Sequence, residues 1–498
     1  MKDFDAVVIG AGNGGLTAAA TLQRAGVDTL LVERHNVPGG CGTSFRRGRF
    51  EFEVALHQLS GVGEEGREGP SLRRLFEDLG VADDLTFVQD GELYRAVVPG
   101  EYDVILPADW DGTVATIEAA FPGNRERTQR FFELVKTVAI GRMAAMRGAP
   151  PDRVPAELFQ YGLRSTKEVL DEHFDDQRVK SALGVYWTYL GQPPSKLRFD
   201  DMALLLFGYL EAKPWHVVGG SQAMSAAILG AFKRAGGTVM FNTAVDKILT
   251  AHGAVAGVQL DSGQEVTASD VVSNISLPVT YGMLDSAAVP TAVSADLQSR
   301  RIGVSGFVLY MGLDASAADL GLTTASTFIN TDLDDDHTYA AMSTLAPARG
   351  TIITCYENPS IGFSPAGGTH ATLMTLQYGS LWEKMRAADY ARTKFGYAQT
   401  LLDHVEHIAP NIRDAIEEID VATPLTMTRY LGHPGGAIYG YDQDATENWP
   451  FRNSERQTHI PGLHLAGSWP GMGGFQPTLE AGVRVARRLM RGKSTKAA

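Results

Sequence analysis

The hydrophobic pattern at the start of the chain predicts a strand, a glycine-rich turn, a helix and a second strand. Residues 7–9 are apolar and run into residues 10–15, which read GAGNGG. The Ala-rich residues 16–24 predict a helix that ends at Gly26, and residues 27–32 predict a strand that Glu33 closes. This order of elements is typical of a Rossmann-type unit, in which a glycine-rich turn joins the first strand to the helix.

Patterns of the same kind recur at two distant places in the chain. The first of these predicts a turn, a helix, a strand, a hairpin and a further strand, at 217–224, 225–234, 236–245, 255–267 and 270–274. The other predicts a strand, a loop and a helix, at 462–468, 469–476 and 477–490, with Pro477 as the first helical residue. We therefore expect one Rossmann-type α/β domain that is built from discontinuous segments.

The stretches between these blocks predict a second, interleaved domain. Residues 66–214 are helix-rich, whereas residues 286–425 mix strand patterns with a long helical region. We expect these two stretches to form an α+β substrate domain. The nucleotide-binding domain then comprises the three remaining segments, 1–65, 215–285 and 426–498.

Composition narrows the class of protein. The chain has 498 residues, enough for two or three domains, and 44% of them are hydrophobic, an ordinary value for a globular protein. A net charge of −14 argues against binding to nucleic acid or to anionic membranes. The two cysteines, Cys41 and Cys355, make no disulfide framework, and we expect a reducing, cytoplasmic location. No apolar run has the length of a transmembrane helix.

Each part of the first turn has a physical role in binding a dinucleotide. Gly10 permits the tight turn, Gly12 lets the backbone approach a pyrophosphate, and Gly15 lets the helix pack closely on the strand. The helix N-terminus offers unpaired N–H groups and the positive end of its dipole to the phosphates. Glu33 can accept hydrogen bonds from the two hydroxyls of a ribose. The chain is therefore predicted to bind a dinucleotide.

The residues that follow indicate which dinucleotide, through a resemblance. Glu33-Arg34, the Gly39-Gly40 doublet and residues 50–53 (FEFE) are similar to the extended FAD motif of the amine oxidase and phytoene desaturase superfamily. In those proteins the doublet lies against the pyrophosphate and the ribityl chain of the flavin, so the resemblance implies FAD. The residues that it implies for the cofactor site are Gly10, Gly12, Asn13, Gly14, Gly15, Glu33, Arg34, Gly39, Gly40, Cys41, Gly42, Thr43, Ala244, Val245, Asn274, Gly467, Ser468, Gly474, Phe475 and Gln476.

Further motifs resemble one branch of that superfamily. They are residues 52–57, 191–195, 423–426 with Tyr430, and 435–440. Together they look most like the phytoene desaturase-like flavoproteins, and within them the branch of carotenoid isomerase and all-trans-retinol saturase. The sequence departs from the family pattern at Glu53, Ala55 and Ser468, where members usually have Asp, Gly, and Asp or Gln. The changes at positions 53 and 55 lie near the expected flavin face.

The same resemblance places candidate chemistry near the flavin. The loop 471–476 enters the last predicted helix, whose N-terminus would lie at the pyrimidine end of the isoalloxazine and stabilise the negative charge of reduced flavin. His57 and His433 are candidate acid–base residues, because a histidine can exchange a proton near neutral pH. Tyr439 is a third catalytic candidate, with packing of a pocket wall as its competing role.

These observations favour an FAD-dependent oxidoreductase that acts on C–C bonds of an apolar, polyene or isoprenoid-like substrate, by desaturation, saturation or isomerisation. An oxidase or dehydrogenase that acts on the C–N bond of an amine shares the FAD motifs and is the alternative. A flavin-free binding protein of the GDP-dissociation inhibitor kind is a remote third, against which the intact glycine motifs argue.

Partners follow from the same motifs. No second G-x-G-x-x-G unit supports an NAD(P)H domain, so the expected electron partner is oxygen, a quinone or a redox protein. An apolar substrate would imply transient contact with membranes. The acidic segment 332–337 begins like a calcium loop but lacks its glycine and its final glutamate, so we expect no metal site. The sequence leaves the oligomeric state open.

Overall fold

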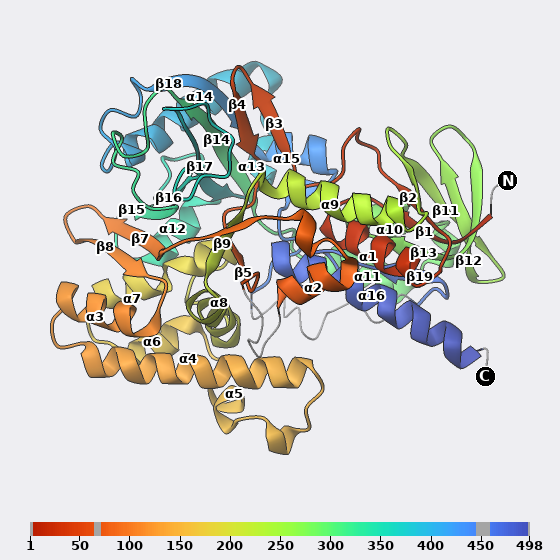
Figure 1. Ribbon diagram of the computed structural model, residues 1–498, viewed down its shortest axis with the longest axis horizontal. Helices are drawn as coiled ribbons and strands as arrows, with labels where there is room; N and C mark the ends of the chain where they lie inside the picture. Colours follow the sequence, from red (N-terminus) through yellow and green to blue (C-terminus); the bar gives the residue numbers. More distant parts are fainter. Residues whose placement is uncertain (1–2, 64–70, 445–458, 497–498) are drawn as a thin grey trace.

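Two seven-stranded sheets lie in separate halves of the molecule (Figure 1). The computed structural model describes residues 3–63, 71–444 and 459–496. Helices cover both faces of each sheet, and two small sheets join the halves. No helix within these three ranges has both the length and the apolar content needed to cross a membrane.

The first sheet gathers strands from three distant parts of the chain. Its order is β10-β2-β1-β13-β12-β11, and β19 pairs with β13. The central strand β1 pairs in parallel with β2 and β13, whereas β12 is antiparallel to its neighbours. The strands are β1 (Asp3–Ile9), β2 (Thr29–Val32), β10 (Thr238–Met240), β11 (Val245–Ala251), β12 (Ala254–Leu260), β13 (Glu265–Ser273) and β19 (Leu463–Leu465).

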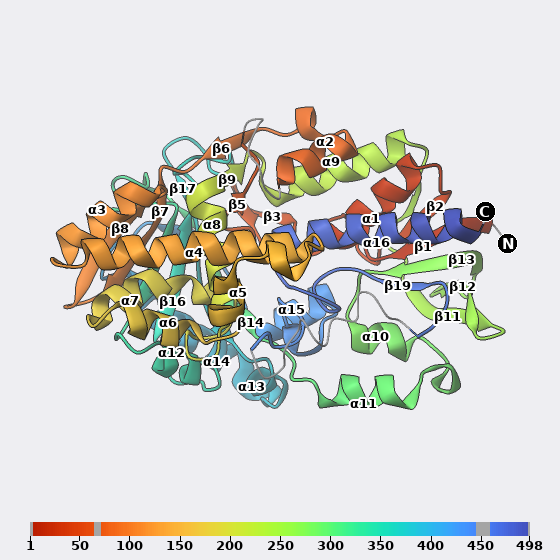
Figure 2. The ribbon, with the colours of Figure 1, turned by 90° about the horizontal axis from the view of Figure 1, so that it is seen from below.

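Three helices share one face of this sheet, as Figures 1 and 2 show: α1 (Asn13–Arg24), α9 (Gly220–Arg234) and α16 (Phe475–Lys496). α1 and α16 touch backbone to backbone. A Cβ atom on Gly482 of α16 would lie 2.1 Å from the carbonyl oxygen of Gly14. Thr17 Oγ1 in α1 also donates a hydrogen bond of 2.8 Å to the carbonyl of Leu479. The N-terminal and C-terminal segments of the nucleotide-binding half are thus held in direct contact through α1 and α16.

The second sheet has the order β18-β14-β17-β16-β15-β7-β8. Every position of β14 and β17 is buried. Alternate residues of β14 face two different cores: Phe307 packs with α14 (Ala387–Val405), whereas Val308 packs with the helices on the opposite face. The strands are β7 (Glu92–Val98), β8 (Tyr102–Pro107), β14 (Ser305–Leu313), β15 (Ser326–Asn330), β16 (Gly350–Cys355), β17 (Thr369–Gln377) and β18 (Ile416–Ala422).

A layer of helices covers the face of the second sheet that carries Val308. Figure 2 shows α4 running along this layer. The helices are α3 (Trp110–Ala120), α4 (Arg125–Met146), α5 (Ala156–Tyr161), α6 (Thr166–His173), α7 (Gln177–Gly184) and α8 (Phe199–Ala212).

Two small sheets connect the halves. β3 (Ser44–Arg47) and β4 (Phe50–Glu53) form a hairpin, and β5 (Leu59–Ser60), β9 (Pro214–Val217) and β6 (Phe87–Gln89) form a three-stranded sheet. Phe50 packs so closely on β14 that a Cβ atom on Gly312 would lie 2.5 Å from its ring. The β3–β4 hairpin is therefore fixed against the second seven-stranded sheet.

The predicted Rossmann-type fold is confirmed, with local differences. The two strands predicted at 264–267 and 270–274 are one strand, β13, because its residues pair with β1 along most of their length. α16 begins at Phe475, before the predicted Pro477, since a proline without an N–H fits any early helical position. The predicted boundary at residue 65 lies outside the described residues, and the domain limits stay a prediction.

The contact between α1 and α16 can be tested with two substitutions in α16. Gly482→Ala should lower the free energy of unfolding by about 1–3 kcal/mol, because its methyl group would meet the Gly14 carbonyl. Gly492→Ala is the matched control: apart from its own helix backbone and chain neighbours, no atom of the described residues lies within 4 Å of its ideal Cβ, so it should change stability by less than about 1 kcal/mol. Thermal melting compares the two variants, and equal shifts in Tm would contradict the close contact.

Candidate functional site

A cavity of about 2180 Å³ begins at the carboxyl ends of β1, β2 and β13 and extends between the two sheets. Ile9, Val32 and Asn274 line its first part, and Val308 and Met374 of the second sheet line the opposite part. Ligands of open parallel sheets bind at this end of the strands. The position therefore fits a dinucleotide at one end and a substrate at the other.

The glycine-rich turn leaves only backbone at the start of α1. A Cβ on Gly15 would lie 1.9 Å from the carbonyl oxygen of Gly10, and Gly10 itself has φ +88°. The N–H of Gly39 donates to the carbonyl of Ala11 over 2.7 Å, which brings the second glycine loop beside the first. Gly12 begins α1 without a side-chain cap. The free N–H groups of the first helical turn are thus available to a pyrophosphate.

The carboxylate of Glu33 is held in place by backbone donors. Its Oε2 accepts a hydrogen bond of 2.6 Å from the N–H of Ala11, and its Oε1 accepts one of 2.9 Å from the N–H of His35. Glu33 lines the cavity. Because each carboxylate oxygen has a further lone pair, this group can still accept hydrogen bonds from a ribose diol. Its chemistry fits the adenosine end of FAD.

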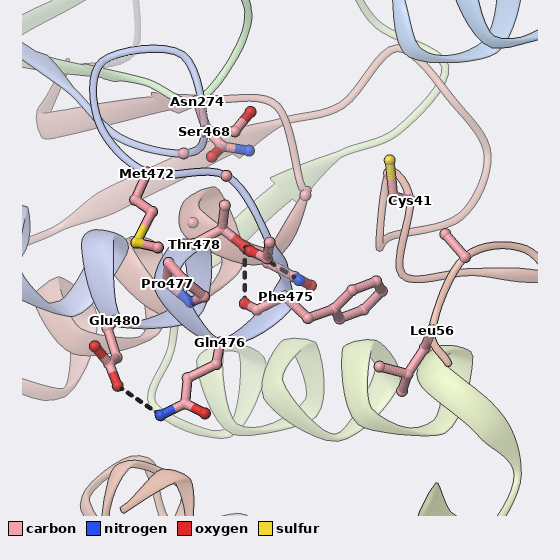
Figure 3. Close-up of a pocket in the computed structure, with 18 of the residues that line it drawn as sticks. Cys41, Leu56, Asn274, Ser468, Met472, Phe475, Gln476, Pro477, Thr478 and Glu480 are labelled. Atoms are coloured by element: carbon pink, nitrogen blue, oxygen red, sulfur yellow. Dashed lines mark hydrogen bonds between the residues drawn. The ribbon is translucent and has the colours of Figure 1, made fainter. Parts of the chain in front are cut away.

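The start of α16 closes the opposite side of the cofactor groove (Figure 3). The side chain of Phe475 extends from the helix start toward the wall that carries Cys41 and Leu56. Asn13 lines the groove, and its amide Nδ2 donates to Thr478 Oγ1 at 3.4 Å. Its Oδ1 is buried and has no hydrogen-bond partner in the described part of the chain. A buried acceptor left without a donor fits a bound group that supplies one.

Most of the residues predicted for the cofactor line this cavity. They are Gly10, Gly12, Asn13, Gly14, Glu33, Arg34, Gly39, Gly40, Cys41, Ala244, Val245, Asn274, Gly467, Ser468, Gly474, Phe475 and Gln476.

Gly15, Gly42 and Thr43 lie behind the cavity wall instead. Thr43 Oγ1 donates to Gln222 of α9 over 2.6 Å, and the carbonyl of Gly42 accepts from Ser225 over 2.7 Å. Gly42 and Thr43 thus fix the second glycine loop to α9, whereas Gly15 lies in α1.

His57 lines the cavity with a neutral ring. Its Nδ1 lies 2.6 Å from Thr354 Oγ1, and the ring stacks on Tyr189 with centroids 5.6 Å apart. Burial, and then the electrostatic effect of the nearby His216, lower the pKa of His57 to about 4. The imidazole is therefore unprotonated at neutral pH.

His433 and Tyr439 line the same cavity. His433 Nδ1 donates to the carbonyl of Ala437 over 2.8 Å, and its ring meets Trp469 edge-on. Burial lowers the pKa of His433 to about 4, against the opposing effect of its backbone hydrogen bond. Burial raises the pKa of Tyr439, which stays a phenol. All three catalytic candidates therefore meet one cavity in uncharged form.

Glu53 has a different place from the one predicted. It is absent from the cavity lining and buried, where it accepts hydrogen bonds from the N–H and the hydroxyl of Ser221 over 2.7 and 2.6 Å. Ser221 lies in the first turn of α9, so the carboxylate caps that helix from outside. Burial raises the pKa of Glu53, and these hydrogen bonds oppose the rise. The carboxylate at this position thus contacts a helix end, while the neighbouring Val54 and Ala55 line the cavity.

The substrate end of the cavity combines residues of the motifs 52–57 and 435–440 with residues that no motif marks. They come from the segment between β4 and β5, from β14, β17 and α8, from the 3₁₀ segment Val185–Tyr189, and from α15 (Pro424–Leu431) with the loop after it. We call this part of the cavity the chamber. Its lining residues are Leu56, His57, Gln58, Thr188, Tyr189, Tyr209, Val308, Thr372, Met374, Met427, Ile438 and Tyr439.

Known relatives match nearly the whole chain. All-trans-retinol 13,14-reductase of Danio rerio is 27% identical over 529 residues, covering 96% of this chain and 84% of that protein. Prolycopene isomerase of Daucus carota is 22% identical over 98% of this chain and 80% of its own. Lycopene-forming phytoene desaturase of a Paracoccus species is 24% identical over 94% of each chain. The resemblance drawn from the motifs is confirmed.

The fold is also that of a solved amine oxidase. Putrescine oxidase bound to putrescine superposes with a TM-score of 0.67 over 99% of each chain, at 16% identity. Residues 14–490 match the sequence profile of the flavin containing amine oxidoreductase family. The chain belongs to this family. It is an oxidoreductase, and FAD is its cofactor.

The buried histidines should make the protein less stable in acid. Each has a pKa near 4 when folded, below the ordinary 6.5, so the unfolded chain binds more protons between these values. The free energy of unfolding should fall as the pH drops through this window. His433→Gln should reduce that fall by about 1 kcal/mol or more, measured by urea denaturation at about pH 7 and 4.5.

The exposed His407 provides the control for this comparison. His407→Gln should change the pH dependence of unfolding less than His433→Gln does, because an exposed ring loses little solvation on folding. If His433→Gln and His407→Gln had the same small effect, a neutral buried ring at position 433 would be contradicted.

Proposed function

We propose that the protein is an FAD-dependent oxidoreductase that acts on a C–C bond of an apolar, polyene or isoprenoid-like substrate. The observation that carries the proposal is the wall of the chamber, where Leu56, Val308, Met374 and Ile438 present apolar side chains to the cavity. A conjugated hydrocarbon can bind there through burial of apolar surface alone.

The position of charge in the cavity supports the same substrate class. Among the described residues, no charged lining residue belongs to β14, β17 or the segment 54–58. The charged lining residues are Arg24, Glu33, Arg34, Arg73, Arg74, Glu77, Asp78, Arg147, Asp201, Glu211, Glu480, Arg484, Arg487 and Arg488. Two of them, Asp201 and Glu211, lie on α8, but none of the residues named above as the chamber lining carries a carboxylate.

Bound FAD would supply a two-electron centre that exchanges a hydride with a substrate carbon. The chain's own residues do the rest. The N-terminus of α16 directs the positive end of its dipole into the groove, and the apolar chamber excludes water. A proton must leave or reach the neighbouring carbon, and the neutral ring of His57 can accept, at its unprotonated nitrogen atom, a proton that leaves the substrate. Tyr439 supplies a hydroxyl in the same wall.

The names of the relatives support a C–C reaction, because a retinol reductase, a prolycopene isomerase and a phytoene desaturase all act on polyenes. The competing proposal is an amine oxidase, favoured by the putrescine oxidase fold. It would need a group in the chamber that recognises an amine, and the chamber carries none of the charged lining residues. A flavin-free binding role predicts a colourless protein, whereas membership of a flavoprotein family predicts a yellow one.

The reaction class can be read from the flavin spectrum without oxygen. The FAD-loaded enzyme, oxidised or photoreduced, is mixed with polyenes, prenyl lipids and amines, and the products are separated by chromatography. We expect a polyene to bleach the oxidised flavin or to reoxidise the reduced one, and amines to do neither. Product formed while the flavin stays reduced marks an isomerase. Bleaching by an amine alone would contradict the proposal. Oxygen or a quinone added afterwards identifies the electron acceptor.

We also infer that the mouth of the cavity meets a lipid surface. Met143 and Met146 at the end of α4 line the outer cavity, and Met146 is more than half exposed. Ile140, Phe159 and Leu163, on the same helical hairpin, are also more than half exposed. An apolar patch beside the mouth gives a substrate that dissolves in lipid a short path from a bilayer to the chamber.

This surface predicts loss of vesicle binding in a charged variant. The double substitution Met146→Glu and Phe159→Glu should reduce cosedimentation with phosphatidylcholine vesicles by about tenfold or more, because each side chain contributes about 1.5–3 kcal/mol when buried in lipid. Phe395→Glu, at an equally exposed aromatic residue on α14, should have no effect. The same loss in both proteins, or in neither, would contradict the assignment.

A further inference from the structure

A buried contact between a carboxyl group and a histidine lies beside the chamber. Asp90, in the turn after β6, and His216 of β9 are each 2% exposed, and His216 Nε2 lies 3.0 Å from Asp90 Oδ2. The other carboxylate oxygen, Oδ1, is buried and has no hydrogen-bond partner in the described ranges. Such a pair is costly to bury and gives little net stability compared with apolar packing. The contact between Asp90 and the chamber residue Gln58 indicates a role other than stabilising the fold.

Gln58 connects this pair to the chamber. Its side chain lines the cavity, and its Nε2 donates to the same Asp90 Oδ2 over 3.1 Å. Its Oε1 accepts from the hydroxyl of Tyr186 at 3.4 Å, and its backbone carbonyl accepts from the hydroxyl of Tyr209 at 3.3 Å. Tyr209 also lines the chamber. Both ends of Gln58 are therefore fixed by polar contacts, one of them to the buried carboxylate.

The carboxylate fixes which way the amide of Gln58 points. A carboxylate can only accept hydrogen bonds, so Gln58 turns its NH₂ group toward Asp90, and the Leu93 carbonyl accepts from the same group at 3.5 Å. An asparagine at position 90 could both donate and accept, and either orientation of the amide would then be satisfied. Loss of the charge would thus release Gln58 without removing an atom from the wall.

We propose that Asp90 is a positioning residue of the chamber: held by His216, it orients the amide of Gln58 and thereby fixes the His57–Gln58 segment in the chamber wall. The inference rests on the proposed function, because it gives that segment a role in placing the substrate. Thr354 holds the His57 ring from the other side. The segment between β4 and β5 is therefore anchored at two neighbouring residues by partners from distant parts of the chain.

A double-mutant cycle tests whether Asp90 acts through Gln58. The FAD-loaded proteins are wild type, Asp90→Asn, Gln58→Met and the double variant. Two quantities are compared: the rate at which diethylpyrocarbonate modifies His57, mapped by mass spectrometry, and the Kd of parinaric acid, a fluorescent conjugated tetraene. Each single variant should change the modification rate by about threefold or more and raise the Kd by about tenfold. The double variant should resemble the single ones.

Asp200→Asn is the matched control. Asp200 is also 2% exposed and pairs with the buried Arg198, but it is absent from the cavity lining. This variant should lower Tm while leaving the modification of His57 and the Kd within about twofold. With a substrate in hand, Asp90→Asn should raise KM more than it lowers kcat.

The outcomes separate the two proposals. If no polyene binds or reacts with the wild type, the proposed function fails, while the modification rate of His57, which needs no substrate, still tests the positioning role. Additive effects in the double variant, or an Asp90→Asn protein that differs from wild type in Tm alone, would overturn the role of Asp90.

Discussion

The structure depends on one close approach of main chain to main chain, at the turn where β1 enters α1. A Cβ on Gly15 would lie 1.9 Å from the Gly10 carbonyl, so helix and strand touch without a side chain between them. The same small surface receives α16, since Gly482 approaches the carbonyl of Gly14 in the same way. It also receives the second glycine loop through the Gly39–Ala11 hydrogen bond. Three distant segments thus meet where the helix N-terminus can face a pyrophosphate.

The half of the molecule that contains the second sheet supplies the apolar wall of the chamber. Because β14 and β17 are buried on both faces, one face packs on α14 and the other presents Val308 and Met374 to the cavity. The hairpin that carries Phe50 is fixed to that sheet, and the chain continues from there through His57 and Gln58. Within the described residues, the short segment between β4 and β5 therefore helps to set the position of the chamber relative to the nucleotide groove.

The nucleotide-binding elements could be predicted because their signals are local. Glycines at fixed spacing, a strand-length apolar run and Glu33 lie within a few dozen residues and report one backbone geometry. The chamber could not be predicted in this way. A strand that is buried on both faces shows no alternation of polar residues, so nothing in residues 305–313 marks Val308 as a wall residue.

Polar contacts between residues that are far apart in the sequence could not be predicted either. Glu53 was expected near the flavin and instead caps α9 through Ser221, a residue 168 positions away. Gln58, Asp90 and His216 likewise form one contact from three separate segments. Single residues of this kind have no neighbouring motif, and only the tertiary fold brings them together.

A crystal structure of the FAD-loaded enzyme would test the account most directly. The account predicts the ribose diol within hydrogen-bond distance of Glu33, the pyrophosphate at the N-terminus of α1, and one face of the isoalloxazine open to the wall formed by Leu56, Met374 and Ile438. An isoalloxazine turned away from that wall, or facing a carboxylate in place of the apolar chamber, would contradict it.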